Sequence, residues 1–378
     1  MKQAAHLETG IFLLCRRSGS SLQWRDLLLP AATAWRWRCS SEGASPAGVV
    51  HVFWDAGMLD HDAGAGVFDT GFDPGFLEVL EKHPENPDRV RNMVSILRRG
   101  PISSYISWHP GRSAHTSELL SFHTPEYVEE LVQADAEGPT KLCEGTFLNP
   151  PSRADGYCFL NNAGIASQLA LDSGCRRVAV IDIDVHYGNG TAEGFYRSSR
   201  VLTISLHMNH GSWGPSHPQS GAIDELGEGE GLGYNLNIPL PNGTGDKGYA
   251  YAMSELVAPA VRKFDPGSSS SFFFWVQFDP NGRQCLTMAG YRTIGGVARE
   301  LAQELAGGRL LLVQEGGYHL TYSAYCLHAT LEGVLGLEEA PLLPDPVAYY
   351  PEDEAFAVEV VDAIKRQWRK TNPLFRDP

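Results

Sequence analysis

The stretch VAVIDIDVHYGNGT, residues 178–191, decides the fold of this chain and carries its chemistry. It opens with the mostly apolar, β-branched run Val178–Asp182, which is typical of a buried strand in a parallel sheet. Asp182, Asp184 and His186 then occupy every second position, so an extended chain would turn their side chains to one side. Gly188–Gly190 predicts a tight turn at the carboxyl end of this strand, the edge where open α/β sheets place their sites.

These alternating acidic and histidine side chains predict a metal site. Divalent transition metals accept carboxylate and imidazole donors, and catalytic zinc usually has three protein ligands and one open position. The stretch supplies two such donors, so a third must come from elsewhere in the chain. The alternative is a solvated strand end that carries three polar residues and binds no metal.

The composition narrows the class of protein. The 378 residues can form one large α/β domain or two ordinary ones, and no apolar run approaches the roughly 18 residues of a membrane span. Seven cysteines without CxxC pairs predict reduced thiols in an intracellular compartment. The net charge of −15 argues against direct binding to nucleic acid and is compatible with a lysine-rich partner.

Residues 1–48 differ in charge from the rest. Six basic and three acidic side chains give them a net charge of +3, which leaves −18 for residues 49–378. We therefore expect a leader, either a targeting segment or a disordered extension, before a single domain over 49–378. The apolar piece Ile11–Cys15 is too short for the core of a signal peptide.

Several ordered motifs resemble the zinc-dependent histone deacetylase family, most of all its class II-like members in plants. They lie around IDIDVHYGNGT in one order, and the resemblance runs from about Val49 to the C-terminus. The motifs are HPENPDR (83–89), FHTPEYV (122–128), GYCFLNN (156–162), GEGEGLGYNLNIPL (227–240) and QEGGYH (314–319).

The resemblance implies an α/β fold of the arginase and deacetylase type, in which helices flank a central, mostly parallel sheet. We expect the first strand of this domain at 48–54 and the start of a helix at 76–80. The family's zinc ligands correspond to Asp184 and His186, and its oxyanion-stabilising tyrosine corresponds to Tyr318. A structural potassium ion is expected near Asp182, Ser205 and Leu206.

The resemblance also implies two channels. Tyr157 and Trp213 would line a narrow channel for the acyl-lysine side chain, with ordinary loop packing as the alternative. Arg89 would line an internal channel for the released acetate. The sequence alone favours the alternative, in which Arg89 is a surface ion-pair partner at a helix boundary.

The chain departs from the family between Asn149-Pro150 and Ala154-Asp155. Family members carry a helix and a strand there that end in RPPGHH, whose paired histidines take the proton from zinc-bound water. Only three residues occupy this place, and the chain contains no HH pair. The missing strand belongs to the middle of the sheet, so its neighbours should pair across a gap or keep open backbone donors and acceptors.

A second departure affects the third zinc ligand. The family has an aliphatic strand ending in G-x-D, whereas residues 267–284 read GSSSSFFFWVQFDPNGRQ. The ligand position falls near Phe274, which has no lone pair to donate, although FFFWV could still pair as a strand. Asp279 is a possible substitute ligand.

The family reaction is the zinc-dependent hydrolysis of acetyl-lysine, or a related acylated amine, to a free amine and acetate. Members of this family regulate chromatin through that reaction. We expect this chain to be weak or inactive, with Zn²⁺ held weakly and K⁺ held structurally. The alternatives are a catalytically silent isoform that binds partner proteins, or a defective product of splicing or gene modelling. Cytoplasm, nucleus or both are the expected compartments, or a plastid or mitochondrion if residues 1–48 form a transit peptide.

Overall fold

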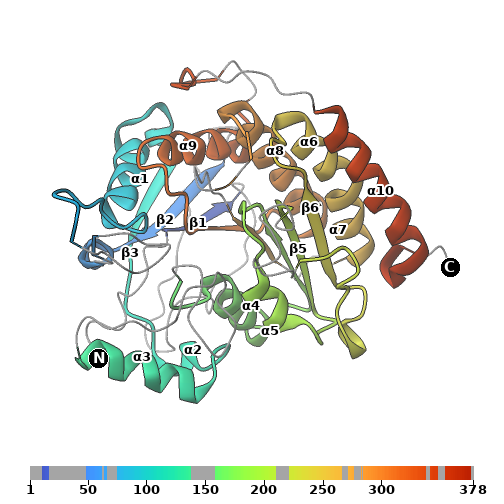
Figure 1. The fold of residues 1–378 in the computed structure, drawn as a ribbon, viewed down its shortest axis with the longest axis horizontal. Coiled ribbons are helices and arrows are strands. Elements are labelled where there is room, and N and C mark those ends of the chain that lie inside the picture. Colours follow the sequence, from blue (N-terminus) through green and yellow to red (C-terminus); the bar gives the residue numbers. More distant parts are fainter. Residues whose placement is uncertain are drawn as a thin grey trace, which may run out of the picture.

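An eight-stranded sheet runs through the middle of the computed structural model (Figure 1). The structure describes residues 11–16, 48–61, 64–65, 75–137, 158–209, 221–265, 271–275, 282, 284–337, 341–347 and 354–375. In spatial order the strands are β3 (Ile106–Pro110), β2 (Val49–Trp54), β1 (Ile11–Arg16), β8 (Leu310–Gln314), β7 (Ser271–Trp275), β4 (Val178–Asp182), β5 (Val201–Met208) and β6 (Asn235–Leu240). The predicted α/β fold with a mostly parallel sheet is confirmed, because β1 alone among these described strands pairs antiparallel with its neighbours.

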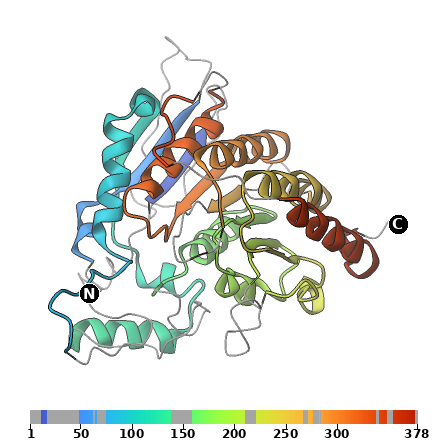
Figure 2. The same cartoon turned by 45° about the horizontal axis from the view of Figure 1, so that its top comes forward.

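Helices cover both faces of the sheet (Figure 2). They are α1 (Pro87–Arg99), α2 (Thr116–Leu119), α3 (Pro125–Glu137), α4 (Asn162–Asp172), α5 (Asn189–Phe195), α6 (Asp246–Ala252), α7 (Ala258–Phe264), α8 (Met288–Leu305), α9 (Tyr322–Leu335) and α10 (Ala355–Thr371). None of the described helices is long and apolar enough to cross a bilayer.

The strand β4 is buried on both faces, as its apolar sequence predicts. Ala179 and Ile181 belong to the main core, which also contains residues of α8 and α9. Val178 and Val180 face the opposite way, into a second core that contains residues of α4. This alternation fixes the register of β4, since a slip of one residue would exchange the two sets.

Local signals set the ends of α1. The side chain of Asn86 accepts a hydrogen bond from the backbone N–H of Asp88, and Pro87 stands in the first turn, where its missing N–H costs nothing. Gly100 ends the helix before Pro101. The expected helix start at 76–80 is wrong, because these residues form no regular element, and Phe76 and Val79 are 86% and 83% exposed.

The middle of the sheet corrects another expectation. We expected a gap or open strand edges there, but β1 lies between β2 and β8 and pairs with both. β1 belongs to the segment that we predicted to precede the domain.

The serine- and phenylalanine-rich segment also joins the sheet. β7 pairs in parallel with β4 on one side and with β8 on the other, which confirms a strand over the FFFW part of FFFWV. The carboxyl ends of β4, β7 and β8 consequently lie next to one another.

Candidate active site

The site begins where β4 ends. The backbone N–H of Asp184 donates to Oδ1 of Asp182 over 2.8 Å, and that of His186 donates to Oδ1 of Asp184 over 2.7 Å. These side-chain acceptors take the place of a strand partner. The intervening Ile183 and Val185 are buried, and the residues after Asp182 no longer form a strand.

Asp184 and His186 lie together at this end of the strand. Oδ1 of Asp184 is 3.5 Å from Nδ1 of His186, and both side chains are mostly buried. Within the described part of the chain, no group of three His, Cys, Asp or Glu side chains could hold a metal ion. The donors in the described residues therefore do not by themselves complete the three-ligand set of a catalytic zinc.

Asp182 has a different environment from Asp184. Its side chain is buried, and its Oδ2 atom has no hydrogen-bond partner among the described residues. Burial raises the pKa of the Asp182 carboxyl well above its usual range, and the nearby charge of Asp184 raises this pKa further. A Cβ atom on Gly188 would stand 2.1 Å from Oδ2, so only glycine fits beside this carboxylate.

The predicted potassium residues lie next to one another. Asp182 of β4 pairs with Ser205 of β5, and Leu206 follows directly. The Oγ of Ser205 accepts a hydrogen bond from the backbone N–H of Gly188 over 3.3 Å and lies 2.9 Å from Nδ1 of His207.

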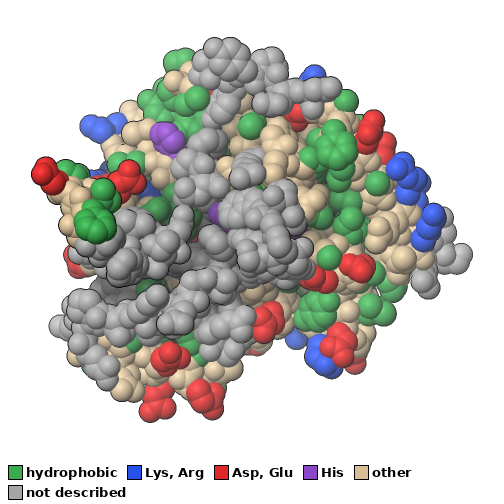
Figure 3. Space-filling model, viewed as in Figure 1, with side chains coloured by type: hydrophobic (Ala, Val, Ile, Leu, Met, Phe, Trp, Pro, Cys, Tyr) green, Lys and Arg blue, Asp and Glu red, His purple; other side chains and the backbone are tan. Residues whose placement is uncertain are grey.

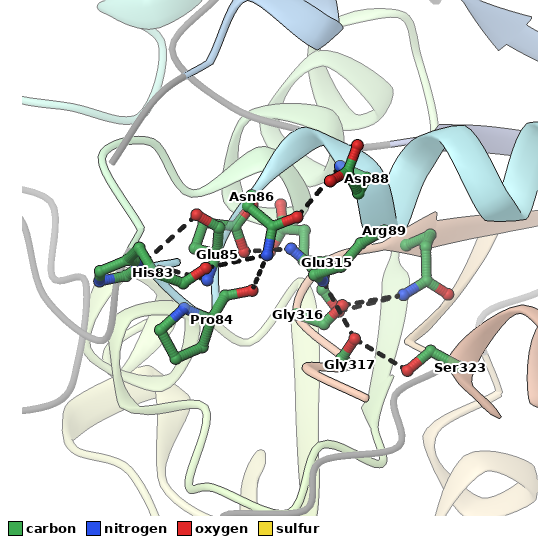
Figure 4. A network of polar contacts seen from close by, with 11 residues as sticks. His83, Pro84, Glu85, Asn86, Asp88, Arg89, Glu315, Gly316, Gly317 and Ser323 are labelled. Carbon is green, nitrogen blue, oxygen red and sulfur yellow. Dashed lines mark hydrogen bonds and ion pairs between the residues drawn. The ribbon is translucent and has the colours of Figure 1, made fainter. Parts of the chain in front are cut away.

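Arg89 connects α1 to the glycine turn before Tyr318 (Figure 4). Its Nε donates to the carbonyl of Gly317 over 3.0 Å, and its guanidinium lies 4.9 Å from the centre of the Tyr318 ring. An ion pair to Glu85 completes these contacts. Arg89 is 1% exposed, so the reading as a surface ion-pair partner is wrong.

Glu315 is a site residue to which the sequence analysis gave no role. The Nδ2 of Asn162 donates to its Oε1 over 2.5 Å. Burial raises the pKa of the Glu315 carboxyl to about 7, and the negative charge of Glu85 contributes to this rise, while the Asn162 hydrogen bond opposes it. An acidic residue directly after a buried strand was the available signal.

Other predicted residues lie outside the described part of the chain, namely Tyr157, Trp213 and Asp279. The backbone of Phe274 is described. It pairs with Ile181 of β4 and Leu312 of β8, so this position stands one pair before Asp182.

Exposed acidic side chains gather on α3. Figure 3 shows acidic side chains along the lower edge of the molecule, where Figure 1 places this helix. Its exposed acidic residues are Glu126, Glu129 and Glu130.

The chain is similar in sequence or structure to several known proteins whose names refer to the same activity. The sequence profile of the histone deacetylase domain matches residues 149–334. "Histone deacetylase 8" of Arabidopsis thaliana is 59% identical over 376 residues, which cover 86% of this chain and 98% of that protein. The "Histone deacetylase-like amidohydrolase" of Pseudomonas aeruginosa is 31% identical over 313 residues, covering 71% of this chain and 81% of the relative. The crystal structure of the HDA15 HD domain superposes with a TM-score of 0.69 at 25% identity, covering 85% of this chain and 95% of that one.

Proposed function

The chain belongs to the histone deacetylase family. We propose that its site descends from a zinc-dependent active site that hydrolyses acetyl-lysine or a related acylated amine. We also propose that this chain has weak or no hydrolytic activity. The observation that carries the proposal is the incomplete set of zinc-donor side chains at the end of β4. Asp184 and His186 stand together at the end of β4, and no third His, Cys, Asp or Glu joins them among the described residues.

The length of one alignment also supports the proposal that this chain lacks segments that its relatives have. Since 86% of 378 residues is about 325, about 50 of the 376 positions aligned with "Histone deacetylase 8" have no residue of this chain opposite them. The sequence lacks RPPGHH, and residues 267–284 lack G-x-D; in the family these motifs supply the general base and a zinc ligand. Loss of a general base alone lowers a rate by about 10²–10⁴.

The retained residues have roles that need no bound zinc. The contacts of Arg89 and Ser323 with the carbonyl of Gly317 hold the turn that precedes Tyr318. A tyrosine hydroxyl held in this way can donate to an acyl carbonyl oxygen. Zinc, when bound in an intact relative, would supply Lewis-acid activation of the carbonyl and of water.

A potassium ion is proposed beside Asp182, Ser205 and Leu206. It is supported by the buried Oδ2 of Asp182, which has no hydrogen-bond partner in the described part of the chain. A cation at this position would compensate the buried carboxylate. The backbone carbonyls of these strand ends are oxygen donors suited to such an ion.

The proposed partner is an acetylated lysine side chain in a protein, or a similar acylated amine. The net charge of −15 and the acidic face of α3 favour a lysine-rich substrate over nucleic acid. Cytoplasm, nucleus or both are the proposed compartments, on the basis of the dispersed cysteines.

Metal analysis and an activity assay test the proposal together. The purified chain, dialysed against zinc-free buffer, should retain well under one equivalent of zinc. It should hydrolyse an acetyl-lysine peptide at least 10²-fold more slowly than a chain with both missing segments rebuilt. A full equivalent of zinc, with turnover that Tyr318→Phe removes, would contradict it.

A binding role is the second candidate, and the exposed segment 76–79 favours it. Phe76, Leu77 and Val79 are 86%, 59% and 83% exposed, although large apolar side chains close together are usually covered. Sedimentation tests the simplest form of this role, which is self-association. The parent should associate, and Phe76→Ser with Val79→Ser should leave a monomer; a monomeric parent at high concentration argues against it.

A further inference from the structure

We propose that β2 and β8 form a strand-accepting slot in the sheet, that Ile11–Arg16 of the same chain is its occupant, and that this strand holds the turn carrying Tyr318 in place. The proposal is independent of whether the chain binds zinc or hydrolyses an amide. It assigns a function to the segment before residue 48, which the family resemblance leaves unexplained.

The first observation behind the proposal is that β1 pairs with β2 on one side and with β8 on the other. Leu13 pairs with Val52 on one side and with Leu312 on the other, and Cys15 pairs with Val50 and Leu310. Every other pairing between the described strands is parallel, whereas both pairings of β1 are antiparallel. β1 is therefore not part of the regular β-α-β winding and enters the sheet as an added strand.

The surroundings of the slot explain why it must be filled. Neighbouring strands lie about 4.8 Å apart, so β2 and β8, with one strand between them, are too far apart to bond each other. Val50 and Val52 of β2, and Leu310 and Leu312 of β8, are at most 2% exposed. Without β1, two rows of backbone donors and acceptors in the middle of the sheet would lose their strand partners, and apolar side chains that β1 helps to bury would be uncovered, which is unfavourable.

The register links the added strand to the site. Ile11 pairs with Gln314, the last residue of β8, and the turn Glu315–Tyr318 begins at the next residue. Because β1 is antiparallel, its first residue lies at the edge of the sheet where this turn and the end of β4 are found. Loss of β1 would leave the end of β8 paired on the β7 side alone, and only as far as Val313, which should loosen the turn whose Gly317 carbonyl Arg89 binds.

Cutting the folded chain tests the proposal without altering the strand. A recognition sequence for a site-specific protease is inserted after Gly43 of the full chain, and the purified protein is cleaved and passed over a size-exclusion column. The fragment that contains residues 1–43 should co-elute one-to-one with the rest of the chain. If the fragment of residues 1–43 elutes separately, and the rest of the chain keeps the thermal unfolding midpoint of the uncut protein, the proposal is overturned.

Two substitutions at one position provide the matched control. Leu13→Pro removes a backbone N–H in the middle of the strand, whereas Leu13→Val keeps that donor and suits a strand. Amide exchange of Val49–Trp54 and Leu310–Gln314 should be at least tenfold faster in Leu13→Pro than in Leu13→Val. Equal exchange in the two variants would overturn the proposal. If Leu13→Pro does not fold while Leu13→Val does, that difference supports the proposal. The cleavage experiment then still tests the parent chain.

Discussion

At the scale of single residues, the site combines buried charges that are compensated to different degrees. Arg89 has an ion pair, a carbonyl acceptor and an aromatic ring around it. Asp182 is buried with one oxygen that has no hydrogen-bond partner in the described part of the chain. Such a site keeps its geometry only while each buried charge has a counterpart.

Arg89→Ala should therefore be strongly destabilising. It leaves Glu85 as a buried carboxylate without its ion-pair partner, which typically costs about 3–5 kcal/mol in the free energy of unfolding. Arg91→Ala is the matched control on the same helix, since Arg91 is exposed and its ion pair with Asp88 is worth less than about 1 kcal/mol. Urea unfolding of both variants measures the difference, and similar losses would show that burial of Arg89 contributes little.

Glu315→Gln should change how stability depends on pH. Burial raises the pKa of Glu315 from 4.5 to about 7, so the folded chain retains a proton that the unfolded chain releases between these values. Stability of the parent should fall as pH rises from about 4.5 to about 7, by roughly 2–3 kcal/mol from this group. Glutamine can still accept from Asn162 and has no charge to bury.

The measurement is urea unfolding of both chains at pH 5 and pH 8 in the presence of a chelator. The stability advantage of the glutamine variant should be larger at pH 8. An advantage that does not change with pH would mean that Glu315 titrates normally in the folded chain.

At the scale of elements, α8 and α9 approach each other through two glycines. A Cβ atom on Gly295 of α8 would stand 2.2 Å from the Thr330 carbonyl oxygen, and one on Gly333 of α9 would stand 2.0 Å from that of Arg292. Both obstacles are backbone atoms of the opposite helix. The helices therefore cannot accept a methyl group without separating.

Gly295→Ala and Gly296→Ala should have opposite effects, although the residues are neighbours in α8. The first forces the helices apart and should cost about 2 kcal/mol. The second places its methyl group in open space and should gain about 0.5–1 kcal/mol from the higher helix propensity of alanine. Thermal unfolding of both variants is the measurement; a stabilising Gly295→Ala would show that the helix contact is loose.

At the scale of the whole molecule, contacts between distant parts of the chain hold the fold. The carboxylate of Glu354, directly before α10, accepts from the backbone N–H groups of Gly245, Lys247 and Gly248 and so caps α6. β1 joins β2 to β8 across the middle of the sheet. In both cases a residue or strand far along the chain satisfies backbone groups that local sequence leaves open.

The sequence by itself determined the elements whose signals are local. The apolar run before Asp182 predicts β4. The motif order predicted the histone deacetylase family, and the D-x-D-x-H spacing placed Asp184 beside His186. Periodicity and capping act over a few residues, so they can be read directly from the chain.

Only the tertiary structure decided where the long-range partners lie. The burial of Arg89 depends on Gly317 and Tyr318, which follow more than two hundred residues later. The place of Ile11–Arg16 depends on two strand edges that exist only after the sheet has formed. Almost every residue offers the same backbone donor and acceptor, so the sequence of a short apolar segment does not reveal which strand edge it will pair with.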